Sequence, residues 1–233
     1  METPSALPIY LQISELLARE IAAGHLRDGQ RLPPERDLAA RLKISVGTLR
    51  KALAELTERG LLERRQGSGN YVRARADARN VYSFFRIELL EGAGLPTARL
   101  LSLDRMAKPD DLPEFGRSTG AHRIRRLRLL SGIACVLEEI WLDGSYTDEI
   151  APRDLSESLY LYYRERLNLS ISHVEDAVSV GDVPDWGPPD FTPAPGTRTG
   201  YVERISFDQE NRRAEFSRNW FDPNLSRYVA RIS

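Results

Sequence analysis

The sequence predicts an α+β protein of two domains: a winged helix-turn-helix domain followed by a domain built on an antiparallel sheet. Two observations support this prediction. Up to about residue 60, apolar residues recur at the three- and four-residue spacing of amphipathic helices. Later in the chain, short apolar runs are separated by turn residues, as in strands and hairpins. We expect the first domain over residues 1–73, a linker without periodicity over 74–80, and the second domain over 81–233.

The first expected helix runs from about Ile9 to Ala23, between Pro8 and Gly24. Its apolar residues fall on one face at helical spacing. They are Ile9, Ile13, Leu16, Leu17 and Ile21.

Two further helices follow in close succession. Pro34 opens the second, with Leu38 and Leu42 as its core contacts. Ser45 is a natural N-cap for the third, and Gly60 is suited to the left-handed residue that ends it. The inward residues of the third helix are Leu49, Ala52, Leu53 and Leu56.

A basic hairpin closes the first domain. Residues 61–65 and 70–72 are predicted as strands around the turn Gln66-Gly67-Ser68-Gly69. This order of elements is typical of DNA binding. The second helix crosses the DNA backbone, the third enters the major groove, and the hairpin lies beside the duplex.

The outward face of the third helix supplies the predicted base contacts. The fork of Arg50 suits O6 and N7 of guanine, whereas Ser45, Thr48 and Lys51 suit phosphates or a thymine methyl group. Arg36 is a candidate at the backbone or an outer base. The full set of candidate DNA-binding residues is Arg36, Ser45, Gly47, Thr48, Arg50, Lys51, Arg64, Arg65, Gln66, Gly67 and Gly69.

Charge is distributed unevenly, in agreement with this prediction. Residues 1–75 hold 13 Lys and Arg against 9 Asp and Glu, whereas the remainder holds 20 against 25. A solvated basic hairpin, or a winged helix that binds protein, is the alternative. It predicts no salt-dependent DNA affinity.

The second domain is expected to consist of hairpins and one amphipathic helix. The predicted elements are a strand over 98–107, a hairpin over 122–142 turning at Ser131-Gly132, a helix over 154–168 capped by Ser156, and a final hairpin over 201–221 turning near Asn211. Residues 183–196 hold five prolines and are predicted as a loop, with one short helical turn at 184–186.

Arg126 and Arg128 are two residues apart on one predicted strand and therefore share a face. Two guanidiniums on one face repel each other unless an anion or a carboxylate lies between them. A two-residue hairpin loop pairs Arg128 with Cys135 and turns Glu138 to the opposite face, whereas a three-residue loop pairs Arg126 with Glu138. The alternative is a solvated sheet face on which the arginines pair with Glu138 or Glu215.

Residues 7–72 resemble the GntR family of bacterial transcription regulators. The resemblance lies in LPIYLQI, GQRLPPERDLAARL, SVGTLRKALAELTERGLL and RRQGSGNYV. It implies DNA contacts at the positions of Arg36, Thr48, Arg50 and Gly67. Val46 stands where the family often has Arg, which removes one expected contact, and Pro34 stands where it has Ser or Ala.

The second domain is similar to the effector domain of the HutC subgroup, the UTRA domain, which resembles chorismate lyase in fold. The similarity lies in RLRLLSGIACVLEE, SLYLYYRERLNLSISHVED and EFSRNWFDPNLSRYVARI, and residues 181–200 depart from it. It implies a homodimer joined through the second domains, operator DNA as partner and a small-molecule effector. The effector-binding residues that it implies are Ser83, Arg126, Arg128, Glu138, Ser158, Tyr160 and Glu215.

Other function classes have little support in the sequence. Cys135 is the only cysteine and the start lacks a signal peptide, so we expect a cytoplasmic protein. No apolar run is long enough to predict a membrane helix. The three histidines lack ligand spacing, and Lys108, the only lysine after residue 51, lies in an expected loop, so neither a metal nor a pyridoxal cofactor is expected. A lyase-like enzyme is the alternative that the second domain's fold suggests, because fold alone does not decide activity.

Overall fold

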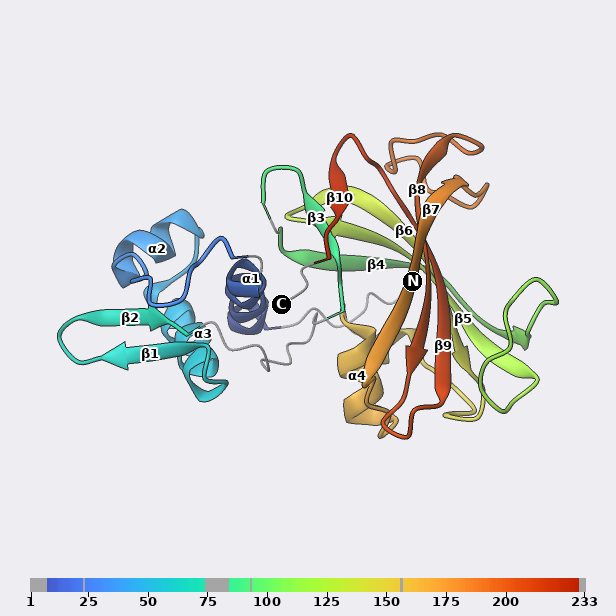
Figure 1. Ribbon diagram of the computed structural model, residues 1–233, viewed down its shortest axis with the longest axis horizontal. Coiled ribbons are helices and arrows are strands. Elements are labelled where there is room, and N and C mark those ends of the chain that lie inside the picture. Colours follow the sequence, from blue (N-terminus) through green and yellow to red (C-terminus); the bar gives the residue numbers. More distant parts are fainter. Residues whose placement is uncertain (1–7, 23, 74–83, 93, 156, 231–233) are drawn as a thin grey trace. The chain divides into compact units, whose positions relative to one another are not determined.

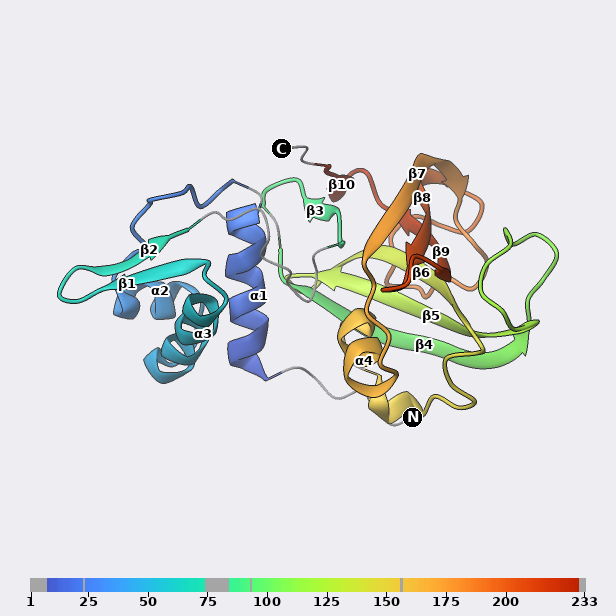
Figure 2. The same cartoon turned by 60° about the horizontal axis from the view of Figure 1, so that its bottom comes forward.

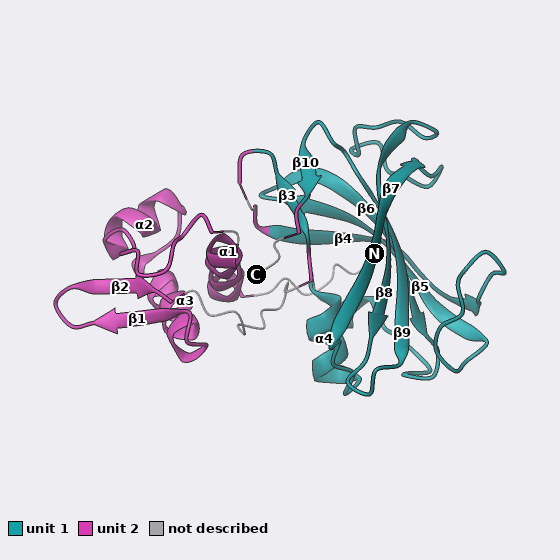
Figure 3. Cartoon of the chain, in the orientation of Figure 1, with its two compact units in different colours: residues 1–6, 86–90, 96–228 teal, residues 7–85, 91–95, 229–233 magenta. Residues whose placement is uncertain are grey.

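The computed structural model describes residues 8–22, 24–73, 84–92, 94–155 and 157–230. The chain folds into two compact units, shown in Figure 1 and coloured separately in Figure 3. We call residues 7–85, 91–95 and 229–233 the helical unit, and residues 1–6, 86–90 and 96–228 the sheet unit. Within the described residues, no helix has the length and apolar character needed to cross a membrane.

The helical unit contains the predicted three helices and hairpin. Its elements are α1 (Ile9–Ala22), α2 (Glu35–Arg41), α3 (Val46–Glu58), β1 (Leu62–Arg65) and β2 (Gly69–Val72). Ser45 caps α3 by accepting a hydrogen bond from the Thr48 amide at 3.0 Å, and Gly60 follows the helix with φ +71°. The four predicted inward residues of α3 are all buried. These predictions are confirmed.

The predicted face of α1 is correct at three positions, only partly buried at Leu16 and wrong at its start. Ile13, Leu17 and Ile21 are buried in the core, but Ile9 is 58% exposed because it begins the helix, beyond the reach of that core. Glu15 is buried as well, which the sequence analysis did not predict, and it accepts a hydrogen bond from Arg59 at 2.6 Å.

The hairpin differs from the prediction by one residue at each strand start. Leu62 pairs with Val72 and Arg65 with Gly69, so that Gln66, Gly67 and Ser68 form the turn. Gly67 and Gly69 adopt φ +72° and +117°, conformations that favour glycine.

The sheet unit is built on six antiparallel strands in the order β4-β5-β6-β9-β8-β7. Its elements are β3 (Ile87–Leu89), β4 (Pro96–Ala107), β5 (Gly120–Leu130), β6 (Ile133–Asp143), a 3-10 helix (Pro152–Asp154), α4 (Leu159–Arg166), β7 (His173–Asp182), β8 (Arg198–Phe207), β9 (Arg213–Phe221) and β10 (Ser226–Tyr228). Strands β3 and β10 form a separate two-stranded ladder.

The two faces of the large sheet have different coverings. Helix α4 lies against one face (Figure 2), where Tyr162 and Tyr163 pack on Ile124 and Ile140. On the other face, the proline-rich segment 183–196 contributes Val183 and Phe191 to a core with Leu127, Leu137 and Trp220. This segment forms turns rather than a longer helix, and at the predicted short turn the Gly187 amide donates to the Pro184 carbonyl at 3.2 Å.

Three further expectations need correction in the sheet unit. Helix α4 is shorter than the predicted 154–168, and its N-cap is Ser158, which accepts from the Leu161 amide. The predicted cap Ser156 lies outside the described residues. Strands β3, β7 and β10 were not predicted. The final hairpin does turn at Asn211, which has φ +64°, as expected.

Candidate functional sites: a DNA interface and an effector site

The start of α3 presents the predicted DNA-contacting side chains to solvent. Gly47, Arg50 and Lys51 are exposed, whereas Thr48 is partly buried. The Ser45 hydroxyl lies 2.8 Å from the Thr48 hydroxyl and also caps the helix, so Ser45 has a structural role beside the predicted one.

Arg50 is oriented by a carboxylate from the neighbouring helix. Its Nε donates to Glu35 Oε2 at 2.7 Å, while its side chain remains 66% exposed. This bond occupies Nε but not the two terminal amino groups, which a bidentate contact with guanine would need. The sequence analysis did not predict this partner, because a contact between positions 35 and 50 depends on how α2 packs on α3.

The wing and α3 share a groove. Arg50 and Arg64 line one hollow of about 300 Å³, and Glu35 contributes to it as well as to an adjoining hollow of about 540 Å³ along the wing turn. Arg65 lies over the Tyr71 ring at 4.3 Å and donates to Glu63 at 3.1 Å. The fold therefore brings Arg50 of α3 and the predicted wing residues to one groove, which Glu35 and Glu58 also line.

Five predicted residues do not line this groove, namely Arg36, Ser45, Gly47, Thr48 and Lys51. Arg36 is exposed at the start of α2, and Lys51 is exposed on α3. Gln66, Gly67 and Gly69 line the wing part of the groove, as expected.

The register of the β5–β6 hairpin combines the two alternatives that the sequence left open. Its loop has two residues, Ser131 and Gly132, both with positive φ. A bulge at Cys135 then shifts the pairing, so that Leu129 faces Ala134 but Arg128 faces Val136. Arg126 consequently pairs with Glu138, the register that a three-residue loop would give.

This register brings Arg126, Arg128 and Glu138 into one buried ion-pair cluster. Glu138 carboxylate oxygens lie 2.7 Å from Arg126 and 3.1 Å from Arg128. The three side chains are between 4% and 6% exposed, so a solvated sheet face is excluded. Although burial disfavours its charge, the two guanidiniums hold the pKa of Glu138 below its ordinary value.

The N-terminus of α4 adjoins this cluster. The main-chain carbonyl of Glu157 accepts hydrogen bonds from Arg128 at 2.9 Å and from Arg126 at 3.4 Å. Ser158, the next residue, is buried and caps the helix. The predicted proximity of Ser158 to the arginine pair is therefore present in the fold.

Tyr160 and Glu215 form a second polar cluster under α4. Glu215 accepts hydrogen bonds from Tyr163 at 2.6 Å, Ser206 at 3.0 Å and Tyr160 at 3.2 Å. Burial raises the pKa of Glu215, although these hydroxyl donors oppose the shift. Glu138 and Glu215 are thus both buried, with pKa values displaced in opposite directions.

Arg204, Asp176 and Tyr228 form a third polar group, which reaches strand β10. Arg204 bonds Asp176 at 2.6 and 2.7 Å, and the Tyr228 hydroxyl donates to Asp176 at 2.7 Å. Sequence reasoning missed these residues, because Asp176 lies on β7 and Tyr228 on β10, which were not predicted as strands. Ser83, the remaining predicted effector residue, lies outside the described residues.

The described residues contain no group of three His, Cys, Asp or Glu side chains placed to hold a metal ion. Cys135 is buried, and burial raises the pKa of its thiol to about 12, which disfavours the reactive thiolate.

Comparison with known proteins identifies the family. Residues 9–72 match the model of the bacterial regulatory proteins of the gntR family, and residues 92–226 match that of the UTRA domain. The chain belongs to the GntR family of transcriptional regulators. Its effector domain assigns it to the HutC subgroup, as the sequence motifs indicated.

Relatives of known name agree with this assignment. The chain is 59% identical to the HTH-type transcriptional regulator SmoD of Agrobacterium fabrum, over 99% of this chain and 98% of that protein. It is 31% identical to the probable transcriptional regulator PhnF of Escherichia coli, over 76% and 75% of the two chains. It is 29% identical to the HTH-type transcriptional repressor NagR of Bacillus subtilis, over 73% and 72%.

Solved structures show the same fold. YydK from Bacillus subtilis matches 97% of this chain and 100% of its own with a TM-score of 0.56 at 23% identity. PhnF from Mycobacterium smegmatis matches 95% and 99% with a TM-score of 0.51 at 18% identity. The expected α+β architecture, a GntR winged helix with a UTRA domain, is confirmed.

Proposed function

We propose that this GntR-family regulator is a repressor that leaves its operator when a small anionic metabolite binds the sheet unit. The metabolite class includes sugar phosphates, amino acids and small carboxylates. The observation that carries the proposal is the Arg126–Glu138–Arg128 cluster, in which two buried guanidiniums share one carboxylate. An anion at the N-terminus of α4 supplies the second negative charge that this cluster favours.

Repression is supported by two relatives that are named repressors, NagR and the mannosyl-D-glycerate transport/metabolism system repressor MngR of Escherichia coli. We place the effector at Arg126, Arg128, Glu138 and Ser158, with Tyr160 and Glu215 as its second polar wall and Ser83 as an additional donor. On the helical unit, Arg50 reads a guanine, and the other predicted residues of α2, α3 and the wing hold phosphates or approach the backbone.

The remaining parts of the proposal concern assembly and the absence of catalysis. A homodimer joined through the UTRA domains places two winged helices on a pseudo-palindromic operator, and the protein acts in the cytoplasm. The relatives are named as regulators, which supports a binding role rather than an enzyme. Turnover of chorismate-like acids by the purified chain would contradict this role.

A thermal-shift screen of the full chain tests the effector class. The panel holds sugar phosphates, amino acids and small carboxylates, and any stabilising compound is then tested for release of operator DNA. Arg126→Lys should weaken the stabilisation, because a point charge replaces the fork. Arg125→Lys is the matched control, since Arg125 lies on the opposite face of the same strand and bonds Glu139. Equal effects of the two variants, or no stabilising anion, would refute the proposed site.

A further inference from the structure

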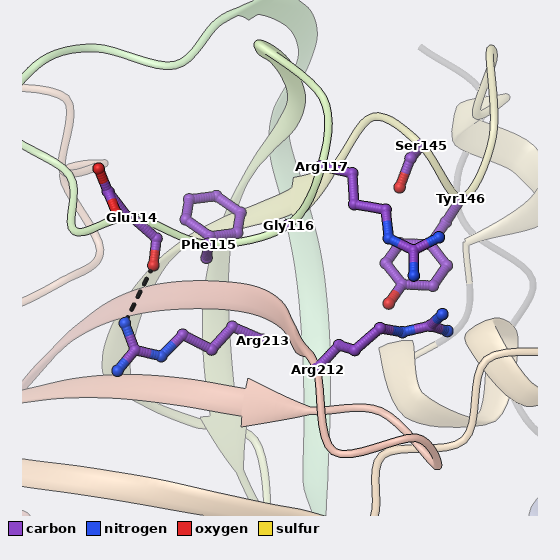
Figure 4. A pocket seen from close by; sticks show the side chains of 8 residues that line it. All are labelled: Glu114, Phe115, Gly116, Arg117, Ser145, Tyr146, Arg212 and Arg213. Atoms are coloured by element: carbon purple, nitrogen blue, oxygen red, sulfur yellow. Dashed lines mark hydrogen bonds between the residues drawn. The ribbon is translucent and has the colours of Figure 1, made fainter.

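A pocket opens at one end of the large sheet (Figure 4), apart from the proposed effector residues. It has a volume of about 620 Å³ and is formed by the loop between β4 and β5, the loop after β6 and the start of β9. Arg117 lies on the first of these segments. Arg126 is nine residues further along the chain, and β5 alone separates the two by about 20 Å.

Three arginines line the pocket, and they differ in how their charges are balanced. Arg212 bonds Asp208 at 2.7 Å and also pairs with Glu210. Arg213 donates to the main-chain carbonyl of Glu114 at 3.2 Å, which carries no full negative charge.

The Arg117 guanidinium points into the pocket above Arg212, and no described residue hydrogen bonds to it or forms an ion pair with it. Among the described residues, no carboxylate lies within ion-pair distance of Arg117 or Arg213. The lining thus holds three arginines and one glutamate, Glu114, and among the described residues Arg117 and Arg213 have no ion-pair partner.

The buried Asp143 carboxylate and a main-chain hydrogen bond hold the backbone that carries these arginines. Gly116 has φ +68°, and a Cβ atom there would lie 2.1 Å from the Asp143 carboxylate, so this position requires glycine. Asp143 is buried and accepts hydrogen bonds from Lys108 at 2.6 Å and from the Ser118 amide at 3.1 Å. The Gly116 amide in turn donates to the Arg213 carbonyl at 2.9 Å. The loop of Arg117 and the strand of Arg213 are thus joined at a defined spacing.

The remaining polar groups of the pocket limit what it can recognise. The Tyr146 hydroxyl donates to Asp208 at 2.9 Å, and the Ser145 hydroxyl donates to Asp143. Because these hydroxyl protons are already used, the free donors of the pocket are guanidinium groups. Guanidinium forks match phosphate and carboxylate oxygens, and the volume is typical of a metabolite site.

We propose that this pocket is a second anion site, which binds a small molecule through a phosphate or carboxylate group held by Arg117 and Arg213. Arg212 stays with its own carboxylates and forms one wall. This site does not depend on the proposed effector function, because it shares none of the effector residues.

Isothermal titration calorimetry of the full chain with inorganic phosphate and with succinate tests the proposal. We expect saturable binding of at least one probe, and the probe that binds more tightly decides between phosphate and carboxylate recognition. Arg117→Gln combined with Arg213→Gln should weaken that binding at least tenfold. Arg153→Gln, which removes an exposed arginine of the same unit outside the pocket, should leave it unchanged.

Three results would overturn the proposal. The first is an absence of saturable binding by either probe. The second is binding that persists in the double variant but is lost in Arg126→Lys, which would support the effector site instead. The third is a double variant that loses operator affinity while it keeps its anion affinity, which would assign the two arginines to the DNA backbone. Equal melting temperatures of the double variant and the parent chain exclude misfolding as the cause of any loss.

Discussion

Arg50 on α3 and Arg128 on β5 each bond one glutamate, yet the side chain of Arg50 is 66% exposed and that of Arg128 is 5% exposed. The exposed arginine keeps terminal donors for a polyanion that arrives from solvent. The buried arginine shares Glu138 with Arg126, so its charge is used in an interior ion pair. In one chain, the same pair of residue types thus serves to present a donor in the helical unit and to build an interior polar cluster in the sheet unit.

The largest difference between the two pairs should appear in stability. Glu138→Gln leaves two buried guanidiniums without their shared carboxylate and should cost about 3–5 kcal/mol of unfolding free energy. Glu35→Gln removes the exposed partner of Arg50 and should cost about 1 kcal/mol or less. Urea unfolding followed by tryptophan fluorescence measures the unfolding free energy of Glu138→Gln, since Trp141, Trp186 and Trp220 all lie in the sheet unit with Glu138. Circular dichroism follows the second variant. Equal losses would remove the distinction.

The next effect concerns DNA. Arg50→Ala should weaken operator binding by about 1–3 kcal/mol and relax the preference at one base, because the guanine contact is lost. Fluorescence anisotropy with a duplex obtained by in vitro selection and with a shuffled duplex measures both quantities. Arg41→Ala, at the exposed end of α2, is the control. An unchanged affinity and an unchanged preference would take Arg50 out of the reading role.

A smaller effect separates the two buried acids of the sheet unit by their pH dependence. The folded-state pKa of Glu215 is raised, so the folded chain binds the proton more tightly than the unfolded chain, and the stability contributed by this group falls as pH rises through that pKa. The folded-state pKa of Glu138 is lowered, so its contribution is lost as pH falls. One proton changes stability by at most about 1.4 kcal/mol per pH unit. In urea titrations from pH 4 to 8, Glu215→Gln should remove the falling component, and an unchanged profile would contradict the assignment.

The smallest expected effect tests whether Ser45 acts on the helix or on DNA. Ser45→Ala removes the N-cap of α3 and should cost about 1 kcal/mol of stability. Ser45→Asp keeps a capping oxygen but adds a negative charge beside the phosphates, so it should retain stability and lose DNA affinity. Thermal melts and anisotropy of both variants separate the roles. An aspartate variant with full DNA affinity would show that Ser45 lies away from the duplex.

Sequence reasoning succeeded in the helical unit because the relevant interactions are local. The spacing of Leu49 and Leu56 places α3, and Ser45 and Gly60 mark its ends within one turn of chain. The contact between Glu35 and Arg50 escaped prediction, since it depends on the packing of two helices.

The sheet unit was less predictable because its contacts depend on strand pairing over long separations. Strand β7 is largely exposed, with Val178 and Val180 more than half exposed, and its sequence alternates apolar and polar residues only over short runs such as 178–180, too short to predict a strand. Without β7, the bond between Asp176 and Arg204 had no basis in the sequence. The pairing of Glu138 with Arg126 depends on a bulge, and no residue type in the sequence predicts that bulge.

That bulge at Cys135 also determines what a one-residue deletion or insertion in the hairpin would do. Between the turn and the bulge, the strands pair in the register that a two-residue turn sets. Beyond the bulge, the pairing is shifted by one residue, so that Arg128 faces Val136. A relative that lacks one residue here would run straight from Ala134 to Val136 and still place Arg126 opposite Glu138. Loss of that single codon would therefore preserve the arginine cluster, whereas an added codon without a second bulge would turn Glu138 to the far side of the sheet.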